Sequence, residues 1–227
     1  MKNKLFKETN QKYAMDLDDA VFKRRSIRKY LTIPVEKEKW SKVLHAAVHA
    51  PSAGNIQNWR IIVVRDKLTI QKIANMCHKQ VWMEQAPLMF VICADVKIAQ
   101  QFYGIRGDRL YSIQNCAAAA QNMLLKATDL GLGACWVSAF EEARLKILLD
   151  IPDHIRPQSI ITLGYPDEVV PEPAKCTLRE IVCFDVFGKL ESEEFLAIHR
   201  LNPHILLKKT VHATKQLVKD IKEKVKK

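Results

Sequence analysis

RLYSIQNCAAAAQNMLLKATDLG, residues 109–131, is the longest stretch of helical character in the sequence. Its run of alanines favours a helix, and its middle is apolar on almost every side rather than along one stripe. A helix of this kind has to be covered by other elements. Gly131 ends the stretch and is typical of the residue that caps a helix. The sequence therefore predicts a central, buried helix.

Segments of strand and helix character alternate irregularly on both sides of this helix. The sequence predicts helices from about residue 17 to the basic residues that follow, within 33–51 up to Pro51, over 67–78 and over 141–150, and strands at 60–66, 87–95, 133–140 and 157–166. Residues 96–109, with Tyr103, Gly104 and Gly107, are predicted to form a polar connection. The irregular alternation favours a mixed β-sheet flanked by helices, in the α+β class.

The size and hydropathy of the chain fit a single globular core. It has 227 residues, 48% of them hydrophobic, and its longest apolar runs have the length of a strand. A membrane-spanning helix needs about 20 such residues. The first residues lack the apolar region and the cleavage site of a signal peptide. We therefore expect a soluble, cytoplasmic protein.

The net charge of +11 is unevenly distributed. Residues 205–227 hold eight lysines against Asp220 and Glu223, so more than half of the excess lies in this tail. An apolar stripe runs through it, and we expect it to be helical and to pack on its own body or on a second subunit. The stripe consists of Leu207, Val211, Val218, Ile221 and Val225. We expect two parts: a main domain over 1–187 and a basic helical extension over 188–227.

The six cysteines form no recognisable site. They occur at 77, 93, 116, 135, 176 and 183, without a C-x-x-C pair and without a histidine at metal-ligand spacing. Buried reduced thiols are the better interpretation, and we predict neither a metal site nor a nucleophilic cysteine.

The basic segment RRSIRKY, residues 24–30, is a candidate anion site. Arg24, Arg25 and Arg28 carry forked donors that suit phosphate oxygens, and the hydroxyl of Ser26 adds a further donor. A cluster of this size is more often a solvated helix end. No glycine-rich phosphate loop occurs in the sequence, so any bound phosphate must be held by side chains.

The loop APSAGNIQNWR, residues 50–60, contains no His, Asp, Glu or Cys for acid, base or nucleophilic chemistry. Its small residues let the backbone approach a flat ligand closely, and Asn55 and Gln57 can donate and accept hydrogen bonds toward a heterocycle. A plain turn with Asn as a cap is the simpler interpretation when the loop is taken alone.

Taken together, these segments resemble one known family. RRSIRKY is followed by APSAGNIQNWRIIVV, APLMFVICAD, NCAAAAQNMLLKATDLGLGACWVSAF and IITLGYPDE, and this series resembles the FMN-dependent nitroreductases in order and spacing over roughly residues 18 to 183. The resemblance implies an intertwined homodimer of α+β subunits with one FMN in each of two sites at the interface.

The resemblance also implies roles for individual residues. Arg24 and Arg25–Ser26 would hold the phosphate and ribityl chain, and Arg28 would reach toward the pyrimidine side of the flavin. The loop of the partner subunit would cover the ring, and segment 136–139 would lie along its other edge. Lys175 lies near the place of a phosphate-binding basic pair, with Cys176 where Arg is common. The cofactor residues so assigned are Arg24, Arg25, Ser26, Arg28, Pro51, Ser52, Ala53, Asn55, Gln57, Trp136, Val137, Ser138, Ala139 and Lys175.

One departure from the family pattern falls in the loop. The family usually has Gln-Pro-Trp where this chain has Gln57, Asn58 and Trp59. The loss of the proline predicts a looser turn.

The implied activity is that of an FMN-dependent NAD(P)H oxidoreductase. Because flavin N5 is then the reactive centre, no side chain is assigned a catalytic role, and Arg28 or backbone amides would stabilise negative charge near N1 and the C2 carbonyl. The electron donor is NADH or NADPH, and the acceptor is a small oxidised molecule such as a nitroaromatic, a quinone or a flavin. Sharing one face of the flavin would give ping-pong kinetics.

Two alternatives remain at this point. The chain could be a specialised member of the superfamily, such as a reductive dehalogenase or a flavin-cleaving enzyme, but residues 96–109 are too short and plain to indicate a substrate lid. It could also be a basic protein with a vestigial flavin core that binds an anionic surface. The tail lacks the Trp or Phe of an interfacial helix, so we do not expect it to bind nucleic acid or membrane.

Overall fold

The computed structural model describes residues 15–190, which fall into two compact units that meet between Pro171 and Glu172. The first unit is built on a four-stranded sheet in the order β1-β2-β4-β3. Its strands are β1 (Trp59–Val64), β2 (Leu88–Asp95), β3 (Gly133–Val137) and β4 (Ile155–Gly164). All three strand pairs in this sheet are antiparallel.

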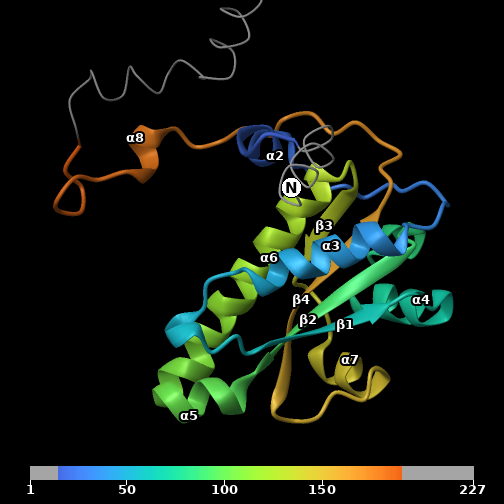
Figure 1. Cartoon of the computed structure of the whole chain (residues 1–227), viewed down its shortest axis with the longest axis horizontal. Coiled ribbons are helices and arrows are strands. Elements are labelled where there is room, and N and C mark those ends of the chain that lie inside the picture. The colour runs from blue at the N-terminus through green and yellow to red at the C-terminus, as the bar shows by residue number, and fades with distance from the viewer. Residues whose placement is uncertain (1–14, 191–227) are drawn as a thin grey trace, which may run out of the picture. The chain divides into compact units, whose positions relative to one another are not determined.

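Helices cover both faces of the sheet (Figure 1). One face packs against α3 (Lys37–Val48) and α6 (Ser112–Asp129), and the other against α4 (Lys67–Met76) and α7 (Glu142–Leu148). The remaining elements of this unit are α2 (Leu17–Lys23), α5 (Val96–Arg106), the 3-10 turns η1 (Ala53–Asn55) and η2 (Val81–Gln85), and the π-helical turn η3 (Gly107–Tyr111). Within residues 15–190, no helix is both long enough and apolar enough to cross a bilayer.

Strand β2 is the centre of the core. Phe90 and Ile92 point into the cluster with α3 and α6, whereas Met89 and Val91 point into the cluster with α4 and α7. Burial on both faces explains why the strand reads as an unbroken apolar run instead of an alternating one. The predicted strand at 87–95 is confirmed.

The central helix is confirmed as α6. Ala119, Ala120, Met123 and Ala127 of this helix lie in the core that α3 and the sheet share. The helix ends as predicted: the Gly131 amide donates to the Thr128 carbonyl at 3.0 Å, and the Leu132 amide donates to the Ala127 carbonyl at 2.8 Å. These two bonds form a Schellman cap, which satisfies carbonyls that the helix leaves without a partner.

The predicted polar connection at 96–109 is wrong. Helix α5 and η3 occupy this stretch, and the Asp95 carboxylate begins α5 by accepting from the Ile98 amide at 3.4 Å. Gly104 interrupts the helix with φ 54° and ψ −144°, a conformation that few other residues adopt. The glycines lower the helical signal of the sequence, although the segment is helical on both sides of Gly104.

The α+β class is confirmed, and the expectation of a mixed sheet needs a correction. Each pair of neighbouring strands in the sheet is antiparallel, and the parallel pairing that the structure records for the described residues is an isolated bridge between Ser26 and Ala134. The order of strands and helices along the sequence does not distinguish a mixed sheet from an antiparallel one, because the direction of a strand depends on the path of the connection that precedes it.

The second unit contains a short helix, α8 (Leu178–Ile181). The Thr177 and Glu180 side chains cap its start reciprocally, as in a capping box. The predicted domains at 1–187 and 188–227 stay a prediction, and the unit boundary lies earlier, after Pro171. The predicted stripe from Leu207 to Val225 lies outside the described residues.

Candidate functional site

The basic segment follows α2 and runs beside the edge of the sheet. The Ile27 amide donates to the Ala134 carbonyl at 3.0 Å, and Ser26 forms the parallel bridge with the same residue. The buried Ile27 side chain fits where Gly133 has no Cβ, since a Cβ there would lie 2.9 Å from it. The segment is therefore fixed along β3.

Arg24, Ser26 and Arg28 lie near the thiol of Cys135 in β3. Burial raises the pKa of the Cys135 thiol, and the charge of Arg28, a hydrogen bond with Ser26 and the charge of Arg24 all oppose that shift. These three predicted residues therefore lie near one position of β3, where the Ser26 bridge and the Ile27 hydrogen bond hold the segment. Arg28 is exposed, with its guanidinium 5.8 Å from the ring centre of Trp82.

Arg25 has different surroundings. Its Nη1 donates to the backbone carbonyls of Phe22 at 2.6 Å and Arg24 at 2.9 Å. Its side chain also lines a cavity of about 280 Å³ that includes Thr128 and Gly131 at the C-terminal end of α6. These contacts tie Arg25 to the end of α2, and its predicted contact with phosphate stays a prediction.

Glu168 is a site residue that the sequence analysis missed. Its Oε1 accepts from the backbone amides of Arg28 and of Lys29, the latter at 3.0 Å. The neighbouring Asp167 forms an ion pair with Lys29 at 2.9 Å. These contacts hold the chain after β4 against the basic segment. The only sequence signal is a pair of acids after the GYP motif, which by itself indicates no partner.

The loop between α3 and β1 is a tight, internally bonded turn. The Ser52 hydroxyl accepts from the Gln57 amide at 3.1 Å, and the Gln57 side-chain amide donates to the Asn55 side-chain oxygen at 3.0 Å. Asn55 and Gln57 both have positive φ, at 55° and 46°. The Ala53 amide donates to Asn115 of α6 at 3.0 Å, and Pro51 at the start of the loop is exposed.

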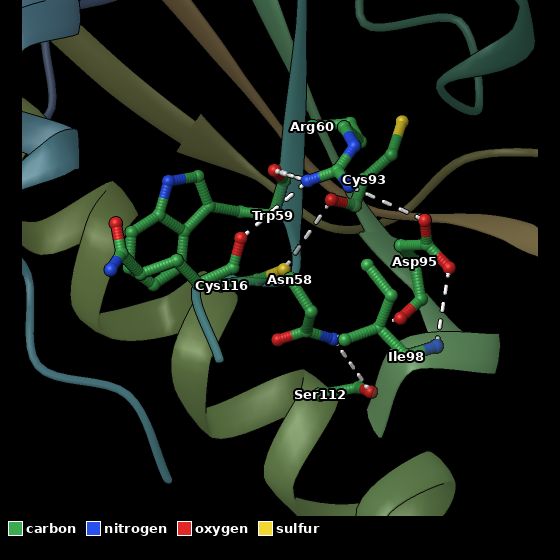
Figure 2. Close-up of polar contacts among 9 residues, drawn as sticks. Asn58, Trp59, Arg60, Cys93, Asp95, Ile98, Ser112 and Cys116 are labelled. Carbon is green, nitrogen blue, oxygen red and sulfur yellow. Dashed lines mark hydrogen bonds and ion pairs between the residues drawn. The ribbon is translucent and has the colours of Figure 1, made fainter. Parts of the chain in front are cut away.

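Asn58 anchors this loop, so the expectation of a looser turn is wrong (Figure 2). Its side chain is fully buried and donates to the Ser112 hydroxyl at 3.0 Å and to the Asp95 carbonyl at 3.1 Å. Its oxygen accepts from the Asn115 side chain at 2.8 Å. The Asn58 amide thus fixes the turn by three hydrogen bonds to β2 and α6, where the family pattern has a rigid proline. This role depends on buried partners that are distant in the sequence, so only the structure shows it.

The loop and Arg25 lie at opposite ends of α6. The loop contacts Asn115 near the start of the helix, whereas Arg25 shares its cavity with Thr128 near the end. Thirteen residues of helix separate these positions by about 20 Å. Figure 1 shows the same arrangement, with α2 near the C-terminal end of α6 and α5 next to its N-terminal end. Within one chain, the structure does not bring Arg25 and the loop together.

The segment 136–139 comprises the last two residues of β3 and the first two residues of the connection to α7. The Trp136 indole is half-buried against the α6 side of the sheet and donates to the Ser138 hydroxyl at 2.6 Å. The Val137 side chain is buried on the opposite face, while Ser138 and Ala139 are exposed. Lys175 lies in the second unit and is exposed.

The profile of the Nitroreductase family matches residues 21–165. The chain belongs to this family. Its match includes the basic segment, the loop and all four strands of the sheet.

Three comparisons illustrate the relationship. A protein of Methanothermobacter thermautotrophicus, named for NADH dehydrogenase and NAD(P)H nitroreductase activity, is 38% identical over 68% of this chain and 79% of its own length. An NADH dehydrogenase of Thermus thermophilus is 32% identical over 68% of this chain and 88% of its own. The solved structure of an FMN-dependent nitroreductase from Clostridium difficile superimposes with a TM-score of 0.65 at 31% identity, covering 75% of this chain and 99% of that one.

The prediction of buried thiols is confirmed for four cysteines of this nitroreductase-family chain and is wrong for the other two. Cys77, Cys93, Cys116 and Cys135 are buried, and Cys176 and Cys183 are exposed. Burial raises the pKa of the Cys77, Cys93 and Cys116 thiols to about 12. A nucleophilic cysteine needs a lowered pKa, so these three thiols are unsuited to that role.

We expect Asn58→Ala to destabilise the loop and the fold together. The change leaves the Ser112 hydroxyl, the Asn115 amide and the Asp95 carbonyl without their shared partner, at a cost of about 1 to 3 kcal/mol of unfolding free energy for buried groups. Denaturant unfolding measures this loss. Asn75→Ala is the control, because Asn75 is exposed on α4 and bonds the Gln71 carbonyl of its own helix. Equal, small effects of both changes would contradict the anchoring role of Asn58.

Proposed function

We propose that this chain is an FMN-dependent NAD(P)H oxidoreductase that passes two electrons to a small oxidised acceptor such as a nitroaromatic, a quinone or a flavin. The main support is a basic segment that the Ser26 bridge and the Ile27 hydrogen bond fix beside β3, in a chain of the Nitroreductase family. The names of the relatives, which include NAD(P)H and FMN, support the donor and the cofactor.

The described residues fit a flavin mononucleotide. Two guanidiniums and a hydroxyl on one edge of the sheet match the donors that a phosphate and its ribityl chain require. We assign Arg24 and Ser26 to that end and Arg28 to the pyrimidine end of the ring. Bound FMN would supply the two-electron redox chemistry, and the positive charge of Arg28 would stabilise negative charge on the ring. Glu168 keeps Arg28 in place through its backbone.

The loop is proposed to cover the flavin of the partner subunit in a homodimer. Two observations support a partner. The loop contacts α6 about 20 Å along the helix from Thr128, which lines a cavity with Arg25, and large apolar side chains are exposed on α2 and α5. These are Leu17, Val21, Phe102 and Ile105. Monomeric proteins seldom expose large apolar patches, and such patches commonly mark interaction sites.

Donor and acceptor are proposed to occupy the same face of the ring in turn. The loop residues that line such a face have small side chains, exposed amides and no titratable group. They can position a planar molecule, but they offer no proton donor of their own. The chain's contribution is therefore to bind and orient the reactants.

Arg24→Gln and Arg28→Gln should each raise the dissociation constant of FMN by about tenfold, since each removes one charge-assisted hydrogen bond. Quenching of FMN fluorescence on titration into the apoprotein measures this. Arg144→Gln is the matched control, because Arg144 is exposed and paired with Glu141 at 2.9 Å on α7. A wild-type protein that takes up no FMN would refute the proposal, and so would Arg24 and Arg28 variants that bind like the control.

Mixing two defective variants tests the shared site. One variant carries Arg24→Gln with Arg28→Gln, and the other carries Gly54→Val, whose Cβ would meet the Tyr103 hydroxyl at 2.0 Å. If each site combines the basic segment of one subunit with the loop of the other, co-refolded mixtures regain one intact site per heterodimer, or about a quarter of wild-type activity. No gain above the separate variants would show that each subunit builds its own site.

Steady-state kinetics with varied NAD(P)H and varied nitroaromatic or quinone acceptor should give parallel double-reciprocal lines. The physical reason is that the two reactants exclude each other from one surface, so no complex holds both. Intersecting lines would show separate binding sites and would remove this part of the proposal while leaving the cofactor assignment untouched.

A further inference from the structure

Helix α5 and the turn η3 carry an exposed cluster of aromatic rings around one arginine. The rings of Tyr103 and Tyr111 meet edge to face with centres 5.2 Å apart, and Phe102 is 6.5 Å from Tyr103. The Arg106 guanidinium lies 5.5 Å from the centre of the Tyr111 ring, and its Nε donates to the Tyr111 hydroxyl at 2.9 Å. Neither the fold nor the proposed flavin contacts require this cluster.

The π-helical turn is what brings Arg106 and Tyr111 together. Residues five apart lie about 140° apart around an α-helix and do not meet. The turn Gly107–Tyr111 is wider, and the Ser112 amide donates to the Gly107 carbonyl five residues back. This geometry puts the two side chains on one side of the backbone. Single π-turns of this kind occur frequently at functional sites.

The cluster adjoins the flavin-covering loop. A Cβ on Gly54 would lie 2.0 Å from the Tyr103 hydroxyl, so the tyrosine rests directly against the loop backbone. From Tyr103, contacts continue to Tyr111 and then to Arg106. Under the proposed function, a molecule stacked on the flavin beneath this loop comes within reach of the cluster.

Arg106 keeps an uncompensated charge. Arg60, Arg144 and Arg156 each pair with a carboxylate, at 3.4, 2.9 and 3.2 Å. Among the residues that the structure describes, no carboxylate forms such a pair with Arg106. The Nε of Arg106 donates to the Tyr111 hydroxyl, and this hydrogen bond fixes the orientation of the guanidinium. The two terminal nitrogens of the guanidinium can still donate to an anion.

We propose that Arg106, held by Tyr111, recognises an anionic group on the planar molecule that reacts at the flavin. The group is a carboxylate or sulfonate on an aromatic acceptor, or a phosphate of the nicotinamide donor, and the Tyr103 and Tyr111 rings flank the planar body. This inference rests on the proposed function for the position of the flavin.

Equilibrium binding to the FMN-loaded protein tests the inference without turnover. Calorimetric titration compares 4-aminobenzoate with the neutral 4-aminobenzamide, and NADP⁺ with NAD⁺. Arg106→Gln should weaken binding of one anionic ligand by about tenfold, as expected for loss of a charge-assisted pair, and should change binding of aminobenzamide by less than about twofold. A loss confined to aminobenzoate identifies the acceptor as the anion, whereas a loss for the nucleotides identifies the donor.

Arg109→Gln provides the matched control. Arg109 is exposed on the same turn and has no aromatic partner among the described contacts. Its substitution therefore removes one positive charge but leaves the Arg106–Tyr111 contact intact. Arg106→Lys keeps the charge and loses the bond through Nε, and should recover only part of the affinity. Added salt should weaken wild-type binding of the anionic ligand and leave aminobenzamide unaffected.

Three results would overturn the inference: unchanged affinities in Arg106→Gln, equal losses for charged and neutral ligands, or an equal effect of Arg109→Gln. Failure of the proposed function is distinct, because the wild-type protein would then bind no FMN at all. Retained flavin absorbance in Arg106→Gln verifies that the variant is folded and loaded.

Discussion

The hydrogen bond from the Ile27 amide to the Ala134 carbonyl joins the basic segment to the sheet. With the bridge at Ser26, it fixes the backbone of the segment, so that Arg24, Ser26 and Arg28 lie beside β3. A solvated helix end would leave these side chains free to move and would lose rotamer entropy on binding an anion. Attachment to a buried strand fixes the backbone of the segment beforehand, so that binding loses less backbone entropy, and Glu168 adds a second restraint on this backbone from the end of β4.

The loop after α3 is restrained in a different way. Its backbone and Asn58 bond to α6 through Asn115 and Ser112, so a buried polar network sets the position of a surface loop. The two candidate halves of a flavin site thus depend on different parts of the same long helix. This arrangement favours a site shared between two copies of the chain, because about 20 Å of helix separates elements that a single small ligand would have to contact.

Much of the fold follows from local features. The unbroken apolar run of β2, the alanine-rich α6 and its cap at Gly131 are properties that periodicity and composition reveal. Helix α5 is not revealed in this way, because Gly104 weakens its pattern while the Asp95 cap and packing around the buried Ala99 stabilise it. The prediction of a looser turn at Asn58 is wrong for a similar reason. Its value comes from three partners that are distant in sequence, and no local rule assigns them.

By itself, the sequence determined the helices and strands with strong periodicity, the α+β class and the residue types that suit a phosphorylated planar cofactor. Only the tertiary structure decided where these residues lie: Arg24, Ser26 and Arg28 near Cys135, Arg25 beside the far end of α6, and the loop at Asn115. The reason is that local preferences depend on neighbouring residues. Side-chain convergence depends on strand pairing and helix packing between segments more than 60 residues apart.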